Sequence, residues 1–270
     1  MLKRRLIPVL ILRDGQVVQS IQFKHTNVIH WNAVTAVDFF NRWSVDEIVV
    51  LDVSRSEKKR ERFYEAVKGL SEKCFVPLTV GGWVGSVDEM RRITRLGADK
   101  VTINTAAFRD PELISQCAAV FGSQCVVVSI DAGQVDGRRV VCIDRGREPT
   151  DVGVVDWAQR AEERGAGEIF LNSIEHDGFR QGYDLELLEQ VTAAVDIPVV
   201  AMGGVFEWQH LVDGVRIGGA DAVAAANIFH YTEHATRKAK AFMAEAGIDV
   251  RIEAISDLKK LGLAQPAGRS

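Results

Sequence analysis

The sequence predicts a barrel of eight parallel strands and eight helices, a (β/α)8 architecture built from two equivalent halves. Short apolar runs alternate with segments of helical period along the 270 residues, close to the usual length of this fold. The chain also nearly repeats itself, because Gly97-Ala98-Asp99 recurs as Gly219-Ala220-Asp221, 122 positions later. A doubly wound open sheet is the competing architecture, but a two-fold repeat closes more naturally into a barrel.

Eight segments have the continuous apolar character of strands buried on both faces. They span residues 6–12, 47–52, 76–80, 100–104, 126–131, 168–172, 197–201 and 222–225. Helical periodicity follows each of them, over residues 32–42, 58–72, 87–96, 112–121, 155–164, 185–195, 208–217 and 234–246. Pro111 suits a helix start, with Asp110 before it as a cap. This order of elements is that of a TIM barrel.

One inserted element and the boundaries complete the expected organisation. Residues 133–147 are more than a simple strand–helix loop needs, and Asp136-Gly137 between apolar flanks predicts a small hairpin there. Asp14-Gly15 holds the matching place in the first half. We expect one barrel over residues 1–252, with half-barrels over about 1–122 and 123–252, and a disordered tail over 253–270.

Composition narrows the functional classes. A net charge of −4, with both signs mixed along the chain, argues against nucleic-acid binding. The apolar stretch after the basic N-terminus is too short to span a membrane and has no cleavage-site pattern. The four cysteines lie in apolar runs without metal-ligand spacing, which is typical of reduced core thiols. We expect a cytoplasmic protein with no metal site or cofactor.

Active sites of such barrels lie at the C-terminal ends of the strands. Gly81-Gly82 recurs there as Gly203-Gly204, and glycine pairs let backbone amides approach phosphate oxygens closely. The alternative, a tight turn, explains one pair but not its recurrence. Because Asn104-Thr105 and Ala226-Asn227 end the neighbouring strands, each half is expected to hold one anion site. Two such sites suit a substrate with phosphate at both ends.

Asp131 ends an apolar strand and is expected to enter the barrel mouth, where a carboxylate can act as a general acid or base. The alternative is a structural carboxylate that caps a loop. Its mate at an offset of 120 is Ile11, so the repeat is broken at the place that matters most for chemistry. Asp52 and Asn172 end two further strands at the same offset.

Asp177-Gly178 follows the sixth strand and presents either a further amide and carboxylate to a ligand or an ordinary turn. His176, on the same loop, is interpreted as a surface residue rather than a catalyst.

These residues together resemble the HisF family, the cyclase subunit of imidazole glycerol phosphate synthase, over nearly the whole chain. The family implies a TIM barrel that receives ammonia from a HisH-like glutaminase docked on its N-terminal face. The ammonia then meets a bis-phosphorylated substrate at the other end, where two aspartates act as general acid and base. The segments that carry the resemblance are Asp14-Gly15, 80–82, 97–100, 103–107, 121–124, 130–132, Asp177-Gly178, 182–184 and Gly203-Gly204.

The chain departs from the family around the expected mouth. The first family aspartate falls at Ile11, which can neither donate nor accept a proton, so a carboxylate pair is excluded there. Trp83 replaces the third glycine of the first phosphate loop and would crowd it. Four further departures, from lysine, threonine, serine and threonine respectively, are Gln19, Asn172, Met202 and Phe179.

The opposite end of the barrel keeps the family pattern. The family gates its ammonia channel with a ring of charges, and four residues match that ring: Arg5, Glu47, Lys100 and Glu168. Buried charges are costly unless they satisfy one another, although a purely stabilising cluster is the alternative. Asp99 and Gln124 match positions near the family's glutaminase interface.

The chain departs from the family at the mouth but keeps its charge ring at the N-terminal end. In this combination it resembles a paralogous HisF-like branch that acts in making acetamidino sugars for surface polysaccharides. That branch implies a glutaminase, a separate sugar amidotransferase and a phosphorylated or nucleotide-linked small-molecule substrate. Two alternatives stay open. The chain is either a genuine cyclase of histidine biosynthesis with an altered site, or a non-catalytic conduit that passes ammonia to another protein.

Overall fold

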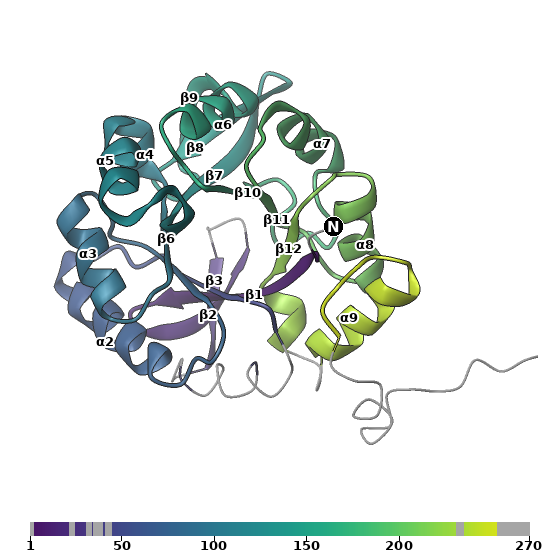
Figure 1. Ribbon diagram of the computed structural model, residues 1–270, viewed down its shortest axis with the longest axis horizontal. Helices are drawn as coiled ribbons and strands as arrows, with labels where there is room; N and C mark the ends of the chain where they lie inside the picture. Colours follow the sequence, from purple (N-terminus) through teal and green to yellow (C-terminus); the bar gives the residue numbers. More distant parts are fainter. Residues whose placement is uncertain are drawn as a thin grey trace, which may run out of the picture.

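The computed structural model describes residues 3–21, 25–30, 34, 40, 45–230 and 235–252. Eight parallel strands close into a barrel with helices around it (Figure 1), which confirms the predicted fold class. The ring closes because β12 pairs with β1. In order around the barrel, the strands are β1 (Arg5–Arg13), β4 (Ile48–Asp52), β5 (Leu78–Gly81), β6 (Lys100–Ile103), β7 (Val126–Val135), β10 (Glu168–Ser173), β11 (Val199–Met202) and β12 (Ala222–Ala225).

Helices cover the outside of the barrel and follow the strands as expected. Local contacts fix where these helices begin. Ser86 caps the helix that begins at Val87, because its hydroxyl accepts a hydrogen bond from the backbone N–H of Glu89 at 3.2 Å. The expected helix over 32–42 and the tail over 253–270 lie almost wholly outside the described residues. The α-helices are α2 (Arg60–Ser71), α3 (Val87–Arg95), α4 (Thr105–Arg109), α5 (Glu112–Phe121), α6 (Val154–Glu163), α7 (Leu185–Ala194), α8 (Trp208–Arg216) and α9 (Ala235–Glu245). Short 3-10 turns are η1 (Glu57–Lys59), η2 (Ser123–Cys125) and η3 (Asn227–His230).

Antiparallel strands extend the barrel at its C-terminal side. The hairpin predicted around Asp136-Gly137 is present between β7 and β8 (Arg138–Ile143), and both turn residues have the positive φ that this turn requires, 48° and 79°. The sequence did not predict its third strand, β9 (Glu148–Gly153). In the first half, β2 (Gln16–Ile21) and β3 (His25–His30) form an antiparallel pair that the sequence did not predict.

The barrel strands bury both faces in separate clusters. The outer face packs against the helices, whereas the inner face fills the lumen with a small apolar cluster that includes Val49, Val127 and Phe170. Both faces are therefore apolar, which is why the strands read as continuous runs.

The strand registers correct one pairing expected from the repeat. Ile11 lies opposite Leu51 in β1 and β4, and Asp131 lies opposite Asn172 in β7 and β10. Asn172 is therefore equivalent to Leu51, not to Asp52. The offset between these two strands is 121 rather than 120, and a one-residue slip matters because it exchanges the faces of every side chain.

The correspondence between the two glycine pairs also changes by one residue. Leu51 lies opposite Gly81, and Asn172 lies opposite Met202, so Gly203-Gly204 is equivalent to Gly82-Trp83. The backbone agrees, with φ of 118° and 60° at Gly82 and Trp83 and of 102° and 89° at their mates. Trp83 therefore holds a left-handed conformation that the other half gives to glycine.

Candidate active site

Two cavities open at the C-terminal ends of the strands, one in each half. The first-half cavity has a volume of about 800 Å³ and the second-half cavity about 460 Å³. Most residues expected at the mouth line them as two separate sets, whereas Ile11 and Asn172 line neither cavity. The first cavity is lined by Gly81, Gly82, Asn104, Thr105 and Asp131, with Asp52 and Trp83. The second is lined by Asp177, Gly178, Gly203, Gly204, Ala226 and Asn227.

Asp131 lies buried in the mouth between two amide side chains. Its Oδ2 accepts a hydrogen bond from Asn104 Nδ2 at 2.9 Å, and its Oδ1 accepts one from Asn172 Nδ2 at 3.0 Å. Burial raises the pKa of Asp131 to about 6, although both amide bonds lower it. A carboxyl with that pKa can take up and release a proton near neutral pH, as a general acid or base requires.

The equivalent place, on β1 between β12 and β4, is apolar. Asn104, Asp131 and Asn172 correspond to Ala226, Ile11 and Leu51, by the strand registers. Ile11 and Ala226 are buried in the lumen cluster, and Leu51 packs against it. A carboxylate at position 11 would therefore have no amide partner at either neighbouring position.

Trp83 follows Gly81-Gly82 in the loop of the first half and lines its cavity. Its indole Nε1 donates to Asp52 Oδ1 at 2.9 Å, and Ser54 donates to both carboxylate oxygens of Asp52 through its backbone N–H and its hydroxyl. Burial raises the pKa of Asp52, against the lowering effect of these bonds. Asp52 therefore positions Trp83 and the turn at Ser54.

Sequence reasoning missed a contact from the inserted hairpin to this cavity. The hydroxyl of Thr105 accepts the backbone N–H of Asp144 at 2.9 Å. Arg145 follows, and its Nη2 donates to the carbonyl of Ser54 at 2.5 Å. Both Asp144 and Arg145 line the cavity. The basic turn between the last two hairpin strands was visible in the sequence, but its partners are 39 and 91 residues away.

The second-half cavity has a narrow glycine loop. A Cβ on Gly204 would lie 2.1 Å from the carbonyl oxygen of Gly182, so only glycine fits there. Asp177 is buried beside the loop. His176, expected to be a surface residue, is only half-exposed, and its Nδ1 lies 2.8 Å from the carbonyl oxygen of Gly182. The carbonyl group of Gly182 therefore contacts both the backbone at Gly204 and the ring of His176.

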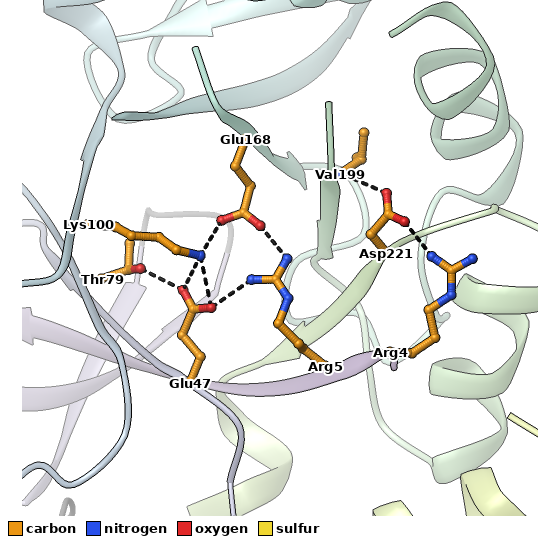
Figure 2. A network of polar contacts seen from close by, with 8 residues as sticks. All are labelled: Arg4, Arg5, Glu47, Thr79, Lys100, Glu168, Val199 and Asp221. Atoms are coloured by element: carbon orange, nitrogen blue, oxygen red, sulfur yellow. Dashed lines mark hydrogen bonds and ion pairs between the residues drawn. The ribbon is translucent and has the colours of Figure 1, made fainter. Parts of the chain in front are cut away.

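The four expected gate residues meet at the N-terminal end of the barrel (Figure 2). Arg5 bonds to both Glu47 and Glu168, and Lys100 bonds to the same two carboxylates, at 3.1 Å and 2.9 Å. Thr79 donates a further hydrogen bond to Glu47 at 2.6 Å. Burial lowers the pKa of Arg5, but Glu168 and Glu47 more than offset this effect and the net pKa is raised. Two cations and two anions thus form a closed, neutral ring.

Asp99 and Asp221 play the same structural part in the two halves. Asp99 Oδ2 accepts the backbone N–H of Leu78 at 2.8 Å, and Asp221 Oδ2 accepts that of Val199 at 3.1 Å (Figure 2). Each carboxylate ties the start of one barrel strand to the next. Asp99 and Gln124 are both exposed on the same end of the barrel as the ring.

Two kinds of feature are absent from the residues that the structure describes. Within the described ranges, no group of three or more His, Cys, Asp or Glu side chains is arranged to hold a metal ion. No helix of the described part of the chain is long and apolar enough to cross a membrane.

Comparison with known proteins gives a consistent family. The family profile described as "Histidine biosynthesis protein" matches residues 5–235. A Vibrio vulnificus protein provisionally named imidazole glycerol phosphate synthase subunit hisF2 is 47% identical over 252 residues, covering 93% of this chain and 92% of its own length. The imidazole glycerol phosphate synthase subunits HisF of Chlorobium luteolum and Chlorobaculum tepidum are each 44% identical over 252 residues, covering 93% of this chain and 100% of theirs. The chain therefore belongs to the HisF family of histidine biosynthesis proteins.

Proposed function

We propose that this chain is an ammonia-using synthase subunit that acts in acetamidino-sugar biosynthesis for surface polysaccharides and does not catalyse the cyclase reaction. The observation that carries the proposal is the asymmetry of the mouth. One carboxylate, Asp131, is held by two amides, while Ile11 and its neighbours are apolar. A reaction that needs two carboxylates would find only one of them here, and the amide partners that a second carboxylate would need are also absent.

Ammonia enters, in this proposal, through the charge ring and the lumen. Glu47 and Glu168 are almost fully buried, and removing either cation would leave a buried negative charge without its full set of partners. Beyond the ring the lumen is lined mainly by small and branched apolar side chains. Such a lining suits passage of neutral ammonia better than of ammonium, because burying an unpaired charge is costly.

A HisH-like glutaminase is the proposed source of the ammonia, docked on the N-terminal face. Two apolar side chains lie exposed at this end, where a docked partner would cover them. Phe75, before β5, is 83% exposed, and Ile217, after α8, is 53% exposed. Asp99 and Gln124 are exposed at the same end.

The proposal is tested by ammonia-dependent turnover of the histidine-pathway intermediate at high ammonium, with a true cyclase as control. We expect turnover lower by about 10²-fold or more, since losing an acid–base group commonly removes that much rate. Turnover near that of the control would overturn the proposal and identify a histidine enzyme. The second carboxylate can be restored in Ile11→Asp, with Ile7→Val in the lumen as a control for packing.

A genuine cyclase is the second candidate, and the named HisF relatives together with the pKa of Asp131 favour it. A non-catalytic conduit is the third, and the two cavities count against it because a conduit needs no substrate site. Asp131→Asn separates the conduit from the synthase. In a system reconstituted with glutaminase and sugar amidotransferase, undiminished product formation by this variant would exclude a catalytic role for Asp131.

A further inference from the structure

We propose that the second-half cavity binds the planar base of a nucleotide-linked substrate, and that Phe206 and Arg180 are the residues that stack on this base. The inference rests on the proposed function, since it takes the nucleotide-linked form of the expected sugar substrate. Asp131 lines the first-half cavity and not this one. The second-half cavity therefore recognises a part of the substrate that does not react.

An arginine–phenylalanine stack lies at the second-half cavity. Cζ of the Arg180 guanidinium lies 4.5 Å from the centre of the Phe206 ring, which is within cation–π distance. Both residues line the cavity, and Phe206 is 51% exposed although burial of a large aromatic ring is favourable. A flat ligand can extend this stack, because guanidinium planes and aromatic faces both stack on nucleobases.

The loop that carries Arg180 is fixed beside the cavity. Arg180 has a φ of 62°, in the left-handed region that costs energy in residues other than glycine. Two residues later, the backbone N–H of Gly182 donates to the carbonyl oxygen of Gly204 at 2.9 Å. Gly204 and Phe206 belong to the loop that follows β11, and both line the cavity. The two loops that supply the stacking residues are therefore joined by a backbone hydrogen bond.

The lining of this cavity suits an uncharged ring better than an anion. Its charged residues are two carboxylates and one guanidinium, namely Asp177, Glu207 and Arg180, so an added anion would meet no excess of positive charge. Most of the other lining residues are apolar, and a base that enters the cavity removes apolar surface from water on both sides. These apolar residues are Ile21, Met202, Val205, Trp208, Ala225, Ala226 and Ile228.

The size and the wall of the cavity fit a ligand of this class. Its volume of about 460 Å³ lies in the range of pockets that hold small molecules. Trp208 forms part of the wall, and its ring lies nearly parallel to the buried ring of Phe229, with 6.3 Å between the centres and an angle of 17°. Gln19 also lines the cavity, and an amide side chain can both donate to and accept from the edge of a base. The cavity therefore combines a stacking pair, a rigid aromatic wall and a polar group.

Saturation-transfer difference NMR of the purified full chain tests the proposal, with uridine, thymidine, cytidine, adenosine and guanosine as ligands and ribose as the ligand without a base. We expect a nucleoside among these to bind, with more saturation on its base protons than on its ribose protons. Phe206→Ala should weaken that binding by about ten-fold or more, the effect of removing an aromatic stacking partner. Phe75→Ala is the matched control, because Phe75 is exposed at the opposite end of the barrel. It should bind as the unaltered protein does.

Two conservative variants separate stacking from folding and from charge. Phe206→Trp keeps an aromatic face and should bind at least as tightly as the unaltered protein, whereas Arg180→Lys keeps the charge but loses the planar face and should bind more weakly. No binding of any of the nucleosides, equal affinity in Phe206→Ala and Phe75→Ala, or saturation confined to ribose protons would overturn the proposal. Unaltered affinity in Arg180→Lys would overturn the role of Arg180. None of these outcomes depends on ammonia transfer or on cyclase turnover, so this inference and the proposed function can fail separately.

Discussion

Asp131 and Asn172 lie directly opposite each other in the register of β7 and β10, and the Asn172 amide donates to the Asp131 carboxylate at 3.0 Å. Their equivalents in the other half, Ile11 and Leu51, also lie opposite each other and are both apolar. The two halves therefore differ by a cross-strand pair rather than by one substitution. A single change at position 11 would place a carboxylate beside a leucine, without the amide that orients Asp131.

Protein stability should depend on pH through Asp131. Its folded-state pKa of about 6 lies above the ordinary 3.8, so the folded protein binds this proton more tightly than the unfolded chain. The stabilisation is fully present below the unfolded pKa and is lost as pH rises through about 6. From about pH 4 to about pH 7.5, Asp131→Asn should gain about 2.4 kcal/mol of unfolding free energy relative to the unaltered protein.

Urea unfolding at several pH values measures this gain. The exposed turn variant Asp136→Asn is the control and should show a constant difference. A difference between Asp131→Asn and the unaltered protein that does not change with pH would contradict the raised pKa.

Coupling of glutamine hydrolysis to product should depend on the ring. Lys100→Met leaves Glu47 and Glu168 with Arg5 as their shared cation, so the ring loses its neutrality. We expect about 2 kcal/mol of lost stability and glutamine consumption in excess of product. Lys58→Met, at an exposed position, should keep both stability and stoichiometry. Equal stoichiometry in the Lys100 variant would mean that the ring is only structural.

The second-half loop should not tolerate a side chain. Gly204→Ala would bring a Cβ within 2.1 Å of the Gly182 carbonyl oxygen at a φ of 89°, which should cost more than about 2 kcal/mol. Gly137→Ala has a comparable φ of 79° but nothing within 4 Å, so it should cost only about 1 kcal/mol. Thermal unfolding of both variants compares the two costs, and equal values would show that the close approach is not what restricts Gly204.

Trp83→Gly should open the first-half loop. The substitution removes the indole and gives the left-handed position the residue that its equivalent already has, so an anion gains room beside the backbone amides of the loop. We expect severalfold tighter binding of inorganic phosphate by calorimetry. Trp83→Phe keeps a ring in place and should leave the affinity near its original value. Unchanged affinity in the glycine variant would show that the loop does not limit anion binding.

Local patterns were enough for most of the framework. The strand over Ala222–Ala225 and the helix over Glu112–Phe121 begin and end where periodicity placed them. The hairpin at Asp136-Gly137 followed from turn chemistry, since these residues accept positive φ. The β2–β3 pair was not predicted, because the sequence between the two strands, Gln22-Phe23-Lys24, holds no Gly, Pro, Asn or Asp that would indicate a turn.

Positions along the chain predicted both candidate sites at one edge of the barrel, because the C-terminal ends of parallel strands meet there. The glycine pairs line two separate cavities at that edge, but Asp131 and Arg145 of the second half line the first-half cavity. Matching the halves by sequence alone failed by one residue at Asp52 and at Gly81. A glycine pair looks the same in either alignment, and only the hydrogen-bond ladder shows which glycine ends the strand.

The sequence by itself determined the order of strands and helices, the absence of a carboxylate at Ile11 and the presence of four ring charges, since each depends on residue identity or local period. Only the tertiary structure decided that Asn172 holds Asp131, that Trp83 is the mate of Gly204, and that Arg145 reaches Ser54 across the cavity. Those relations depend on how the strands register as the barrel closes and on contacts between distant loops. Neither the register nor these contacts produce a periodic pattern in the sequence.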